Sequence, residues 1–376
     1  MSSYPKSEPS TNAGLAGGIY KWPRVYSWID ERLGLSEIVA LAAHKQVPQH
    51  KHSFWYYWGG ISLLCFIVQL LTGVLLLVYY RPGKEAYESV RQITYDVDFG
   101  WLIRSAHSWS ANLMVFAVFV HMFSVFFMKA YKKPREFGWW TGLGLLGIVM
   151  LFGFSGYLLP MDELSYFATK VGLQIPSMMP GMSTIVNNVV RGGPSVGENT
   201  VQRFFALHVV VLPLLFMPLL AFHLALVQKH GNALPAGEAA RPASERRSVP
   251  FFPNFFAMDL AMWLIALNVI TILATMFPWD LGQPANPLSS APVGIHPEWY
   301  FMSQFQLLKG MGLILPGMAG EIGGMGLFTL VLIFWALIPL FDSETVAGKR
   351  GRIATWFGLL VVTGLLGLTI WGYGAL

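Results

Sequence analysis

The chain is poor in charge and in cysteine. Of its 376 residues only 12% are charged, 54% are hydrophobic, and Cys65 is the single cysteine. One cysteine excludes an internal disulfide and any group attached through a pair of thiols. So little charge in so long a chain excludes an ordinary soluble protein and favours a polytopic membrane protein. Nucleic-acid binding is not expected, because the net charge of +5 is not concentrated on a soluble domain.

Long, mostly uncharged stretches recur through the sequence, and Asp259 is the one charged residue within them. Seven of them have about 18 residues or more, which is enough to cross a bilayer as a helix. They cover residues 54–80, 105–128, 137–159, 204–227, 255–277, 323–341 and 353–373. We therefore predict an all-α membrane protein of seven transmembrane helices, with a four-helix bundle followed by three C-terminal helices.

The basic residues lie mostly on one side of these spans. Residues 1–53, 129–136, 228–254 and 342–352 hold 17 of the 25 Lys and Arg residues, and the remaining segments hold 8. The positive-inside rule places the first set, together with the N-terminus, in the cytoplasm. We expect four parts along the chain. They are a cytoplasmic segment with an amphipathic surface helix at 1–53, a four-helix domain at 54–230, a cytoplasmic linker at 231–254 and a three-helix domain at 255–376.

Four of the nine histidines lie inside apolar spans. His107 and His121 are 14 residues apart in the second span, and His208 and His223 are 15 apart in the fourth. Fourteen helical residues return to within roughly 40° of the same face after about 21 Å, whereas fifteen overshoot by about 60°. Because imidazole is a good axial ligand for heme iron, we interpret the histidines as two facing pairs that hold two hemes. The alternative is that each histidine hydrogen-bonds a neighbouring helix.

Glycines repeat with the same spacing in the other two spans of the four-helix part. Gly59 and Gly73 lie in the first span, and Gly142 and Gly156 lie in the third, each pair 14 residues apart. We interpret them as flat places where porphyrin planes press on the helix backbone. Close packing between helices is the alternative.

For each of the two spans that contain histidines, an arginine precedes the first histidine. Arg104 lies three residues before His107, and Arg203 lies five residues before His208. A guanidinium binds carboxylates through two parallel hydrogen bonds, so both arginines are candidates to bind heme propionates. The alternative is that they extend to the membrane interface.

Two carboxylates are candidates for proton transfer. Glu298 lies in the long segment 278–322, directly before Trp299 and Tyr300, and partial burial there should raise its pKa and make it a proton acceptor. Asp259 lies just inside the fifth span, where a carboxylate is a functional candidate for proton delivery. The alternatives are a solvated loop carboxylate for Glu298 and a helix cap for Asp259.

Several motifs occur in the order of one known family. They are Val47-Pro48-Gln49-His50, Phe99-Gly100-Trp101-Leu102-Ile103-Arg104, Lys132-Lys133-Pro134-Arg135-Glu136, Ser155-Gly156-Tyr157-Leu158-Leu159-Pro160 and Pro297-Glu298-Trp299-Tyr300. With them the chain resembles the cytochrome b subunit of quinol:cytochrome c oxidoreductases, the bc1 and b6f complexes. The resemblance runs from about residue 20 to the C-terminus. Residues 54–230, with their histidine spacings, are similar to cytochrome b6, and residues 255–376 are similar to subunit IV of b6f.

The resemblance implies a function and a set of partners. Quinol would be oxidised near the outer face, with Glu298 accepting a proton and Tyr300 hydrogen-bonding the ring. One electron would reach a Rieske iron–sulfur protein and a c-type cytochrome subunit. The other would cross two non-covalent b hemes to a quinone near the cytoplasmic face, where Asp259 would deliver protons. The complex would be a proton-translocating homodimer in a prokaryotic cytoplasmic membrane.

The chain departs from the family pattern in three places. Its two parts are fused, as they are not in b6f, and the eighth helix of the bc1 type is missing. Tyr57 stands where b6 proteins carry the cysteine that binds an extra heme, so no covalently attached heme is expected. Ser124 stands where the family usually has an arginine. Lys129 and Lys133 are the candidates to replace that arginine at the inner heme propionates.

Two other classes of protein remain as alternatives. The chain could be a di-heme membrane anchor for a quinone-linked dehydrogenase or hydrogenase, without a site that divides the two electrons. It could also be a secondary transporter with structural histidines, although inverted repeats and broken helices are not found in the sequence.

Overall fold

A computed structural model describes residues 23–34, 36, 45–178, 181–292, 294–343 and 349–374. In this part of the chain, seven helical stretches are long and apolar enough to cross a membrane. Each overlaps one predicted span, so the predicted all-α class with seven transmembrane helices is confirmed. The elements of these stretches are α3 (Tyr57–Leu77), α5 (Gly100–Phe127), α6 (Glu136–Leu158), the succession α9 (Glu198–Ala206), η3 (Leu207–Val211) and α10 (Leu212–His230), then α12 (Phe256–Met276), α14 (Met318–Phe341) and α15 (Lys349–Gly374).

The chain divides into two compact units, which are residues 1–47 with 248–257 and residues 48–247 with 258–376. The first unit contains α1 (Pro23–Leu33) and most of a two-stranded sheet of β1 (Gln46–Gln49) and β2 (Arg247–Pro250). Within the predicted cytoplasmic segment 1–53, residues 23–33 form α1, whereas residues 1–22, 35 and 37–44 lie outside the described residues. The predicted division at 53, 230 and 254 stays a prediction.

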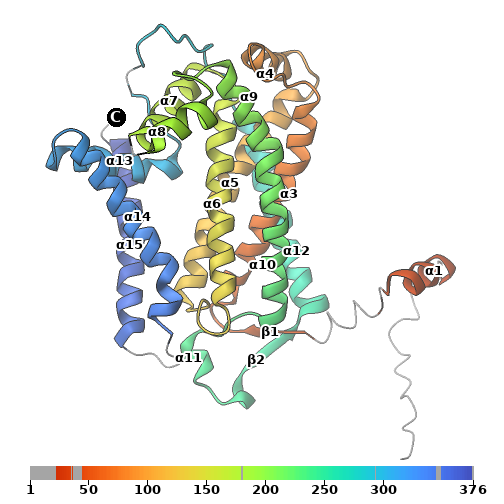
Figure 1. Cartoon of the computed structure of the whole chain (residues 1–376). Coiled ribbons are helices and arrows are strands. Elements are labelled where there is room, and N and C mark those ends of the chain that lie inside the picture. Colours follow the sequence, from red (N-terminus) through yellow and green to blue (C-terminus); the bar gives the residue numbers. More distant parts are fainter. Residues whose placement is uncertain are drawn as a thin grey trace, which may run out of the picture. The chain divides into compact units, whose positions relative to one another are not determined.

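The second unit contains the long helices, which run side by side in Figure 1. α3 packs along α5, and α10 packs along α6. Their sequences are apolar on every face, as expected for helices that meet lipid on one side and other helices on the other. The central core is drawn from five helices. It includes Ile61, Cys65 and Phe66 of α3, Met114 and Val115 of α5, Leu145 and Val149 of α6, Phe216 of α10 and Ile270 of α12.

Two long segments between the spans also contain helices. Residues 160–203 hold α7 (Glu163–Ser177), α8 (Met182–Ile185) and the π-helical turn η2 (Val186–Arg191). Residues 278–322 hold α13 (Trp299–Ile314), which packs against α14 and α15. These helices lie at the end of the bundle opposite to residues 129–136, and we call the end with residues 129–136 the basic end.

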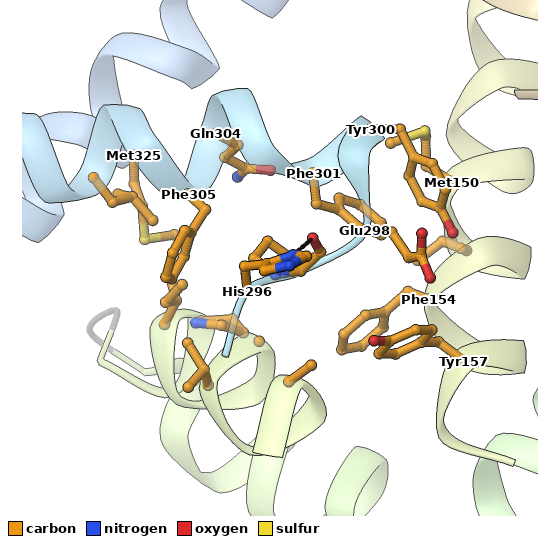
Figure 2. A pocket seen from close by; sticks show the side chains of 18 of the residues that line it. Met150, Phe154, Tyr157, His296, Glu298, Tyr300, Phe301, Gln304, Phe305 and Met325 are labelled. Atoms are coloured by element: carbon orange, nitrogen blue, oxygen red, sulfur yellow. Dashed lines mark hydrogen bonds between the residues drawn. The ribbon is translucent and has the colours of Figure 1, made fainter. Parts of the chain in front are cut away.

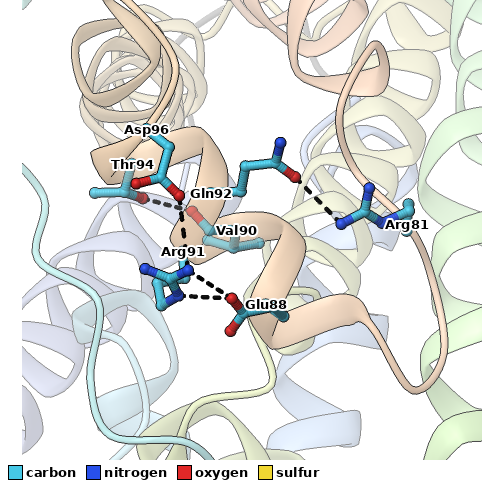
Figure 3. A network of polar contacts seen from close by, with 7 residues as sticks. All are labelled: Arg81, Glu88, Val90, Arg91, Gln92, Thr94 and Asp96. Carbon is cyan, nitrogen blue, oxygen red and sulfur yellow. Dashed lines mark hydrogen bonds and ion pairs between the residues drawn. The ribbon is translucent and has the colours of Figure 1, made fainter.

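A short helix, α4 (Ala86–Tyr95), joins α3 to α5 at the end opposite to the basic end. Its surface carries a network of charged side chains (Figure 3). Arg91 lies 2.6 Å from Glu88 and 3.6 Å from Asp96, and Arg81 donates to Gln92 at 3.2 Å. The ion pairs of Arg91 are largely exposed, so water screens them and they contribute little to stability.

At the basic end, a buried carboxylate joins the four-helix bundle to the C-terminal helices. Asp342 is fully buried, lies 3.0 Å from the Lys132 ammonium and accepts a hydrogen bond from the Tyr131 hydroxyl at 2.7 Å. Lys129 lies 3.7 Å from the same carboxylate and donates to the Gly351 carbonyl at 3.1 Å. Burial lowers the pKa of Lys129, and the Asp342 charge opposes this shift. Lys129 is therefore already engaged, whereas Lys133, the other candidate for the propionates, is exposed.

Candidate functional site

His107 on α5 and His208 on η3 form a facing pair. Their ring centroids are 6.4 Å apart, and the ring planes are inclined by 66°. Imidazole binds metals through bonds of about 2 Å, so one metal between two imidazoles places the ring centres about 6 Å apart. The separation of His107 and His208 therefore fits a single iron ligated from both sides. The second pair, His121 and His223, also lies close enough for the two rings to interact electrostatically.

Hydroxyl side chains orient three of the four imidazoles. The pairs are Thr72 with His107 Nδ1 at 2.9 Å, Ser155 with His208 Nδ1 at 3.0 Å and Thr141 with His223 Nδ1 at 2.9 Å. Each hydroxyl also donates to a carbonyl of its own helix, as Thr72 does to Val68 at 2.6 Å. Its oxygen must therefore accept from the Nδ1–H group of the histidine, which leaves the Nε2 lone pair free to bind a metal.

His121 is different from the other three. Its Nδ1 is buried and has no hydrogen-bond partner among the described residues. The nearby Ser124, which stands where the family usually has arginine, donates instead to the His121 main-chain carbonyl at 2.7 Å. The structure thus defines the tautomer of three imidazoles and leaves the fourth without an orienting partner among the described residues.

The four glycines of the 14-residue repeats each face one of the four imidazoles. A Cβ atom added to each glycine would lie close to the Cε1 atom of the facing histidine. The distance between these two atoms is 3.2 Å for Gly59 and His121, 3.3 Å for Gly73 and His107, 3.3 Å for Gly142 and His223, and 2.7 Å for Gly156 and His208. The missing side chains therefore make room for the histidine rings. The interpretation that porphyrin planes press on these glycines stays a prediction, to which the structure adds the imidazole contact.

The fourth span contains a π-helical turn, η3, which accounts for the 15-residue histidine spacing. A π turn closes i→i+5 hydrogen bonds and holds one more residue than an α turn would. The extra residue offsets the overshoot expected for a regular helix, so His208 and His223 can face the same side. Pro213 follows the turn in the first residues of α10, and its missing N–H deprives the Val209 carbonyl of its α-helical donor.

The two arginines proposed for the heme propionates contact main-chain carbonyls. Arg104 is 7% exposed and donates to the Trp279 carbonyl at 2.6 Å and to the Asp280 carbonyl at 2.9 Å. Arg203 donates to the carbonyls of Asn188 and, at 2.9 Å, of Val189. Arg104 therefore connects α5 to the segment after α12, and Arg203 connects α9 to η2. Their role toward propionates stays a prediction.

A cavity of about 360 Å³ lies between α6, α7, α13 and α14, at the end opposite to the basic end (Figure 2). Its lining is largely apolar, from Phe154, Phe301 and Phe305 among others. The polar side chains that line it are Tyr157, His296, Glu298, Tyr300 and Gln304. An apolar cavity of this size with a few convergent polar groups suits a small, mostly apolar ligand with a polar ring.

Glu298 is the N-cap residue of α13, and its carboxylate does not cap the helix through a hydrogen bond. Burial raises the pKa of Glu298, while the nearby His296 opposes the shift. The pKa of the Tyr300 hydroxyl is also raised by burial, so this group stays protonated as a hydrogen-bond donor. Trp299 donates to the Asn112 side chain at 2.8 Å and so attaches the segment to α5. The structure therefore agrees with the expected burial of Glu298.

Asp259 lies in the first turn of α12, near the basic end, and not at a helix cap position. A Cβ atom added to Gly60 would lie 2.5 Å from its Oδ1 atom, so the carboxylate faces α3. Oδ1 is buried and has no hydrogen-bond partner among the described residues. The residue next to Gly60 is Gly59, which contacts His121, so Asp259 lies beside the segment of α3 that supports the second histidine pair.

Comparison with known proteins agrees with this geometry. Residues 43–231 match the family described as "Cytochrome b/b6/petB", and residues 284–375 match "Cytochrome b(C-terminal)/b6/petD". The chain belongs to the cytochrome b/b6 family. It is 48% identical to the cytochrome bc complex cytochrome b subunit of Chlorobaculum thiosulfatiphilum, over 91% of this chain and 79% of that protein. Membership of this family implies that the chain is an integral membrane protein that binds heme b.

Two further relatives show how its two parts correspond to known cytochromes. The cytochrome b6 of Acaryochloris marina is 41% identical over 56% of this chain but over 99% of its own length. A solved structure titled "Hyperthermophilic respiratory Complex III" aligns with a TM-score of 0.80 and 29% identity, covering 92% of this chain and 91% of that one. The chain is thus a cytochrome b subunit of a bc- or b6f-type complex related to Complex III, in which the two parts are fused.

The hydroxyls that orient the imidazoles of this cytochrome b were not predicted from the sequence. A signal for them exists, because a hydroxyl residue directly precedes three of the four glycines. These dipeptides are Thr72-Gly73, Thr141-Gly142 and Ser155-Gly156. The fourth glycine, Gly59, follows Trp58, and it faces His121, the imidazole whose Nδ1 has no partner among the described residues.

Proposed function

We propose that this chain oxidises quinol in the cavity at Glu298 and passes electrons along its two histidine pairs to a quinone near Asp259. The observation that carries this proposal is the position of one turn of α6 between the cavity and the first histidine pair. Gly153 packs against Tyr300 and Tyr157 lines the cavity, while Ser155 and Gly156 hold His208. A ligand in the cavity is therefore separated from His208 mainly by this turn of α6.

Each residue of the site has a separate role in the proposed reaction. Glu298 accepts a proton from a quinol hydroxyl, because its raised pKa brings it closer to the pH at which it must take up and release protons. Tyr300 donates a hydrogen bond to the ring. His107 with His208 and His121 with His223 would hold two hemes b without a covalent link, and the hemes would supply one-electron transfer between the two ends of the bundle. Asp259 delivers a proton to the quinone at the basic end.

The membrane side of each end follows from the distribution of Lys and Arg residues, and the partner proteins follow from the destination of the other quinol electron. The basic end, with the N-terminus, is assigned to the cytoplasmic face because most Lys and Arg residues lie in its loops. Quinol protons would then leave on the outer face and be taken up on the inner face, in a prokaryotic cytoplasmic membrane. One electron of each quinol goes to a Rieske iron–sulfur protein and a c-type cytochrome subunit, within a homodimeric complex, and the other enters the histidine pairs.

A pulse of oxidant tests whether the two electrons of quinol are divided. The complex purified from native membranes is given quinol and then an oxidant for its c-type cytochrome, with heme b absorbance followed in time. If the electrons are divided, the oxidant transiently increases reduced heme b, because removing one electron releases the other into the histidine pairs. The alternative, a di-heme anchor for a quinone-linked dehydrogenase, predicts only oxidation of heme b. That result, or the absence of an iron–sulfur subunit, would contradict the proposal.

We further predict that no heme is attached covalently to this chain. Tyr57, the first residue of α3, cannot form a thioether. Cys65 lies eight residues further on, about 12 Å deeper and about 80° around the helix, and it is 1% exposed within the apolar core. A denaturing gel stained for heme should therefore show no band at 41.9 kDa. The c-type subunit on the same gel is the positive control, and a stained band at 41.9 kDa would contradict the prediction.

A further inference from the structure

The quinol cavity contains a second proton-accepting side chain that the proposed function does not use. His296 lines the cavity together with Glu298, two residues further along the same segment (Figure 2). The charge of His296 acts on Glu298 and opposes the effect of burial, so the two groups interact electrostatically. Both side chains therefore line the same cavity.

One hydrogen bond defines which nitrogen of His296 is basic. Nδ1 lies 3.0 Å from the Pro297 carbonyl oxygen. A carbonyl only accepts hydrogen bonds, so Nδ1 must carry the hydrogen and donate it. Neutral imidazole then has its lone pair on Nε2, and among the described residues no hydrogen bond to that atom is found. Nε2 is therefore the atom that can take up a further proton.

The described side chains around His296 position its ring, and none of them is a better acceptor for the Glu298 proton. Its ring packs edge-to-face against Tyr373 of α15, with centroids 5.3 Å apart at 71°. The other ionisable residues that line the cavity are Tyr157 on α6 and Tyr300 on α13. Burial raises the pKa of Tyr300, so this phenol does not accept a proton from Glu298. Within the described lining, His296 is the group best suited to receive that proton.

We propose that His296 receives from Glu298 the proton taken from quinol and passes it to water at the outer face. The proposal rests on the proposed function of the cavity and adds the route by which the proton leaves. Glu298 alone can hold one proton, and it must lose that proton before the next quinol can be oxidised. By accepting this proton, a second residue in the same cavity returns Glu298 to its carboxylate form without bulk water entering the apolar site.

The transfer consists of proton movements only. The O–H bond of protonated Glu298 breaks, and an N–H bond forms at Nε2 of His296, directly or through one bridging water, for which the cavity has room. The Glu298 carboxylate is regenerated, and the ring becomes an imidazolium with both nitrogens protonated. Loss of the Nε2 proton to outer water returns His296 to its neutral form. No electron is exchanged in these steps, so no oxidant is needed.

The test uses the complete complex carrying His296→Gln, which keeps the size and polarity of the side chain but cannot take up a proton. We expect kcat for quinol oxidation to fall about 100-fold, the lower end of what a positioned proton-transfer group contributes, while KM for quinol stays the same.

A second variant separates proton transfer from a structural role. In the His296→Ala complex, added imidazole should restore turnover, because the free base can occupy the vacated space and carry the proton. His52→Gln, an exposed histidine at the basic end, is the matched control and should leave kcat unchanged. Unchanged kcat in His296→Gln, or an equal loss in His296→Ala with and without imidazole, would overturn the relay.

The outcome for Glu298 distinguishes this proposal from the proposed function. If Glu298→Gln slows quinol oxidation and His296→Gln does not, the cavity is the quinol site but His296 is not its relay. If Glu298→Gln also leaves turnover unchanged, the proposed function of the cavity fails, and the relay fails with it.

Discussion

Replacing His223 with leucine is expected to remove one of two b hemes from the complex and to leave the other. The substitution deletes one of two iron ligands and leaves the Thr141 hydroxyl without its partner at 2.9 Å. The other pair, His107 and His208, lies at a different depth of the bundle and keeps both its rings. Heme extracted per chain should fall by half, and one of two steps in a redox titration of heme b should disappear.

His230→Leu is the matched control for this experiment. His230 lies on the same helix, α10, seven residues after His223 and therefore within about 20° of the same face. It should retain both hemes. His121→Leu should remove the same heme as His223→Leu, and His107→Leu the same heme as His208→Leu. Both hemes surviving in His223→Leu with unchanged spectra, or a different pattern of pairing, would show that the ligand assignment is wrong.

The second large effect is expected at Glu298. Glu298→Gln keeps the shape of the side chain but removes the proton acceptor, so quinol oxidation should slow by about 100-fold or more. Burial raises the pKa of Glu298, and the acceptor is its deprotonated form. The rate in the unaltered complex should therefore rise with pH through that raised pKa, and this rise should be lost in the variant. Pre-steady-state reduction of heme b by quinol measures both effects.

Two controls define the meaning of that result. The heme content of Glu298→Gln must equal that of the unaltered complex, because α13 contributes no iron ligand. Glu198→Gln changes an exposed carboxylate at the same end of the bundle and should leave the rate and its pH dependence unchanged. Equal rates in Glu298→Gln and the unaltered complex, with quinol oxidation shown to limit turnover, would remove Glu298 from the mechanism.

The amino-acid sequence by itself determined the seven transmembrane helices, and it indicated the residues that we propose to bear the chemistry. A helix in lipid must be apolar along its whole length, whatever its neighbours are, so each span is visible in the local composition. The spacing of His107 and His121 along one regular helix is also a local property, and it predicts their shared face directly. The same holds for Glu298 between Pro297 and Trp299, where the flanking residues predict burial.

Only the tertiary structure decided which groups meet across helices. The π turn after Ala206 brings His208 into line with His223, although fifteen regular helical residues would not. Thr141 reaches His223 from a helix more than eighty residues away, and Arg104 contacts the carbonyl of Trp279. Such contacts depend on how far each helix is rotated and displaced against the next, and packing sets these quantities for the bundle as a whole. A linear pattern records the spacing within each helix but not the rotation between two helices.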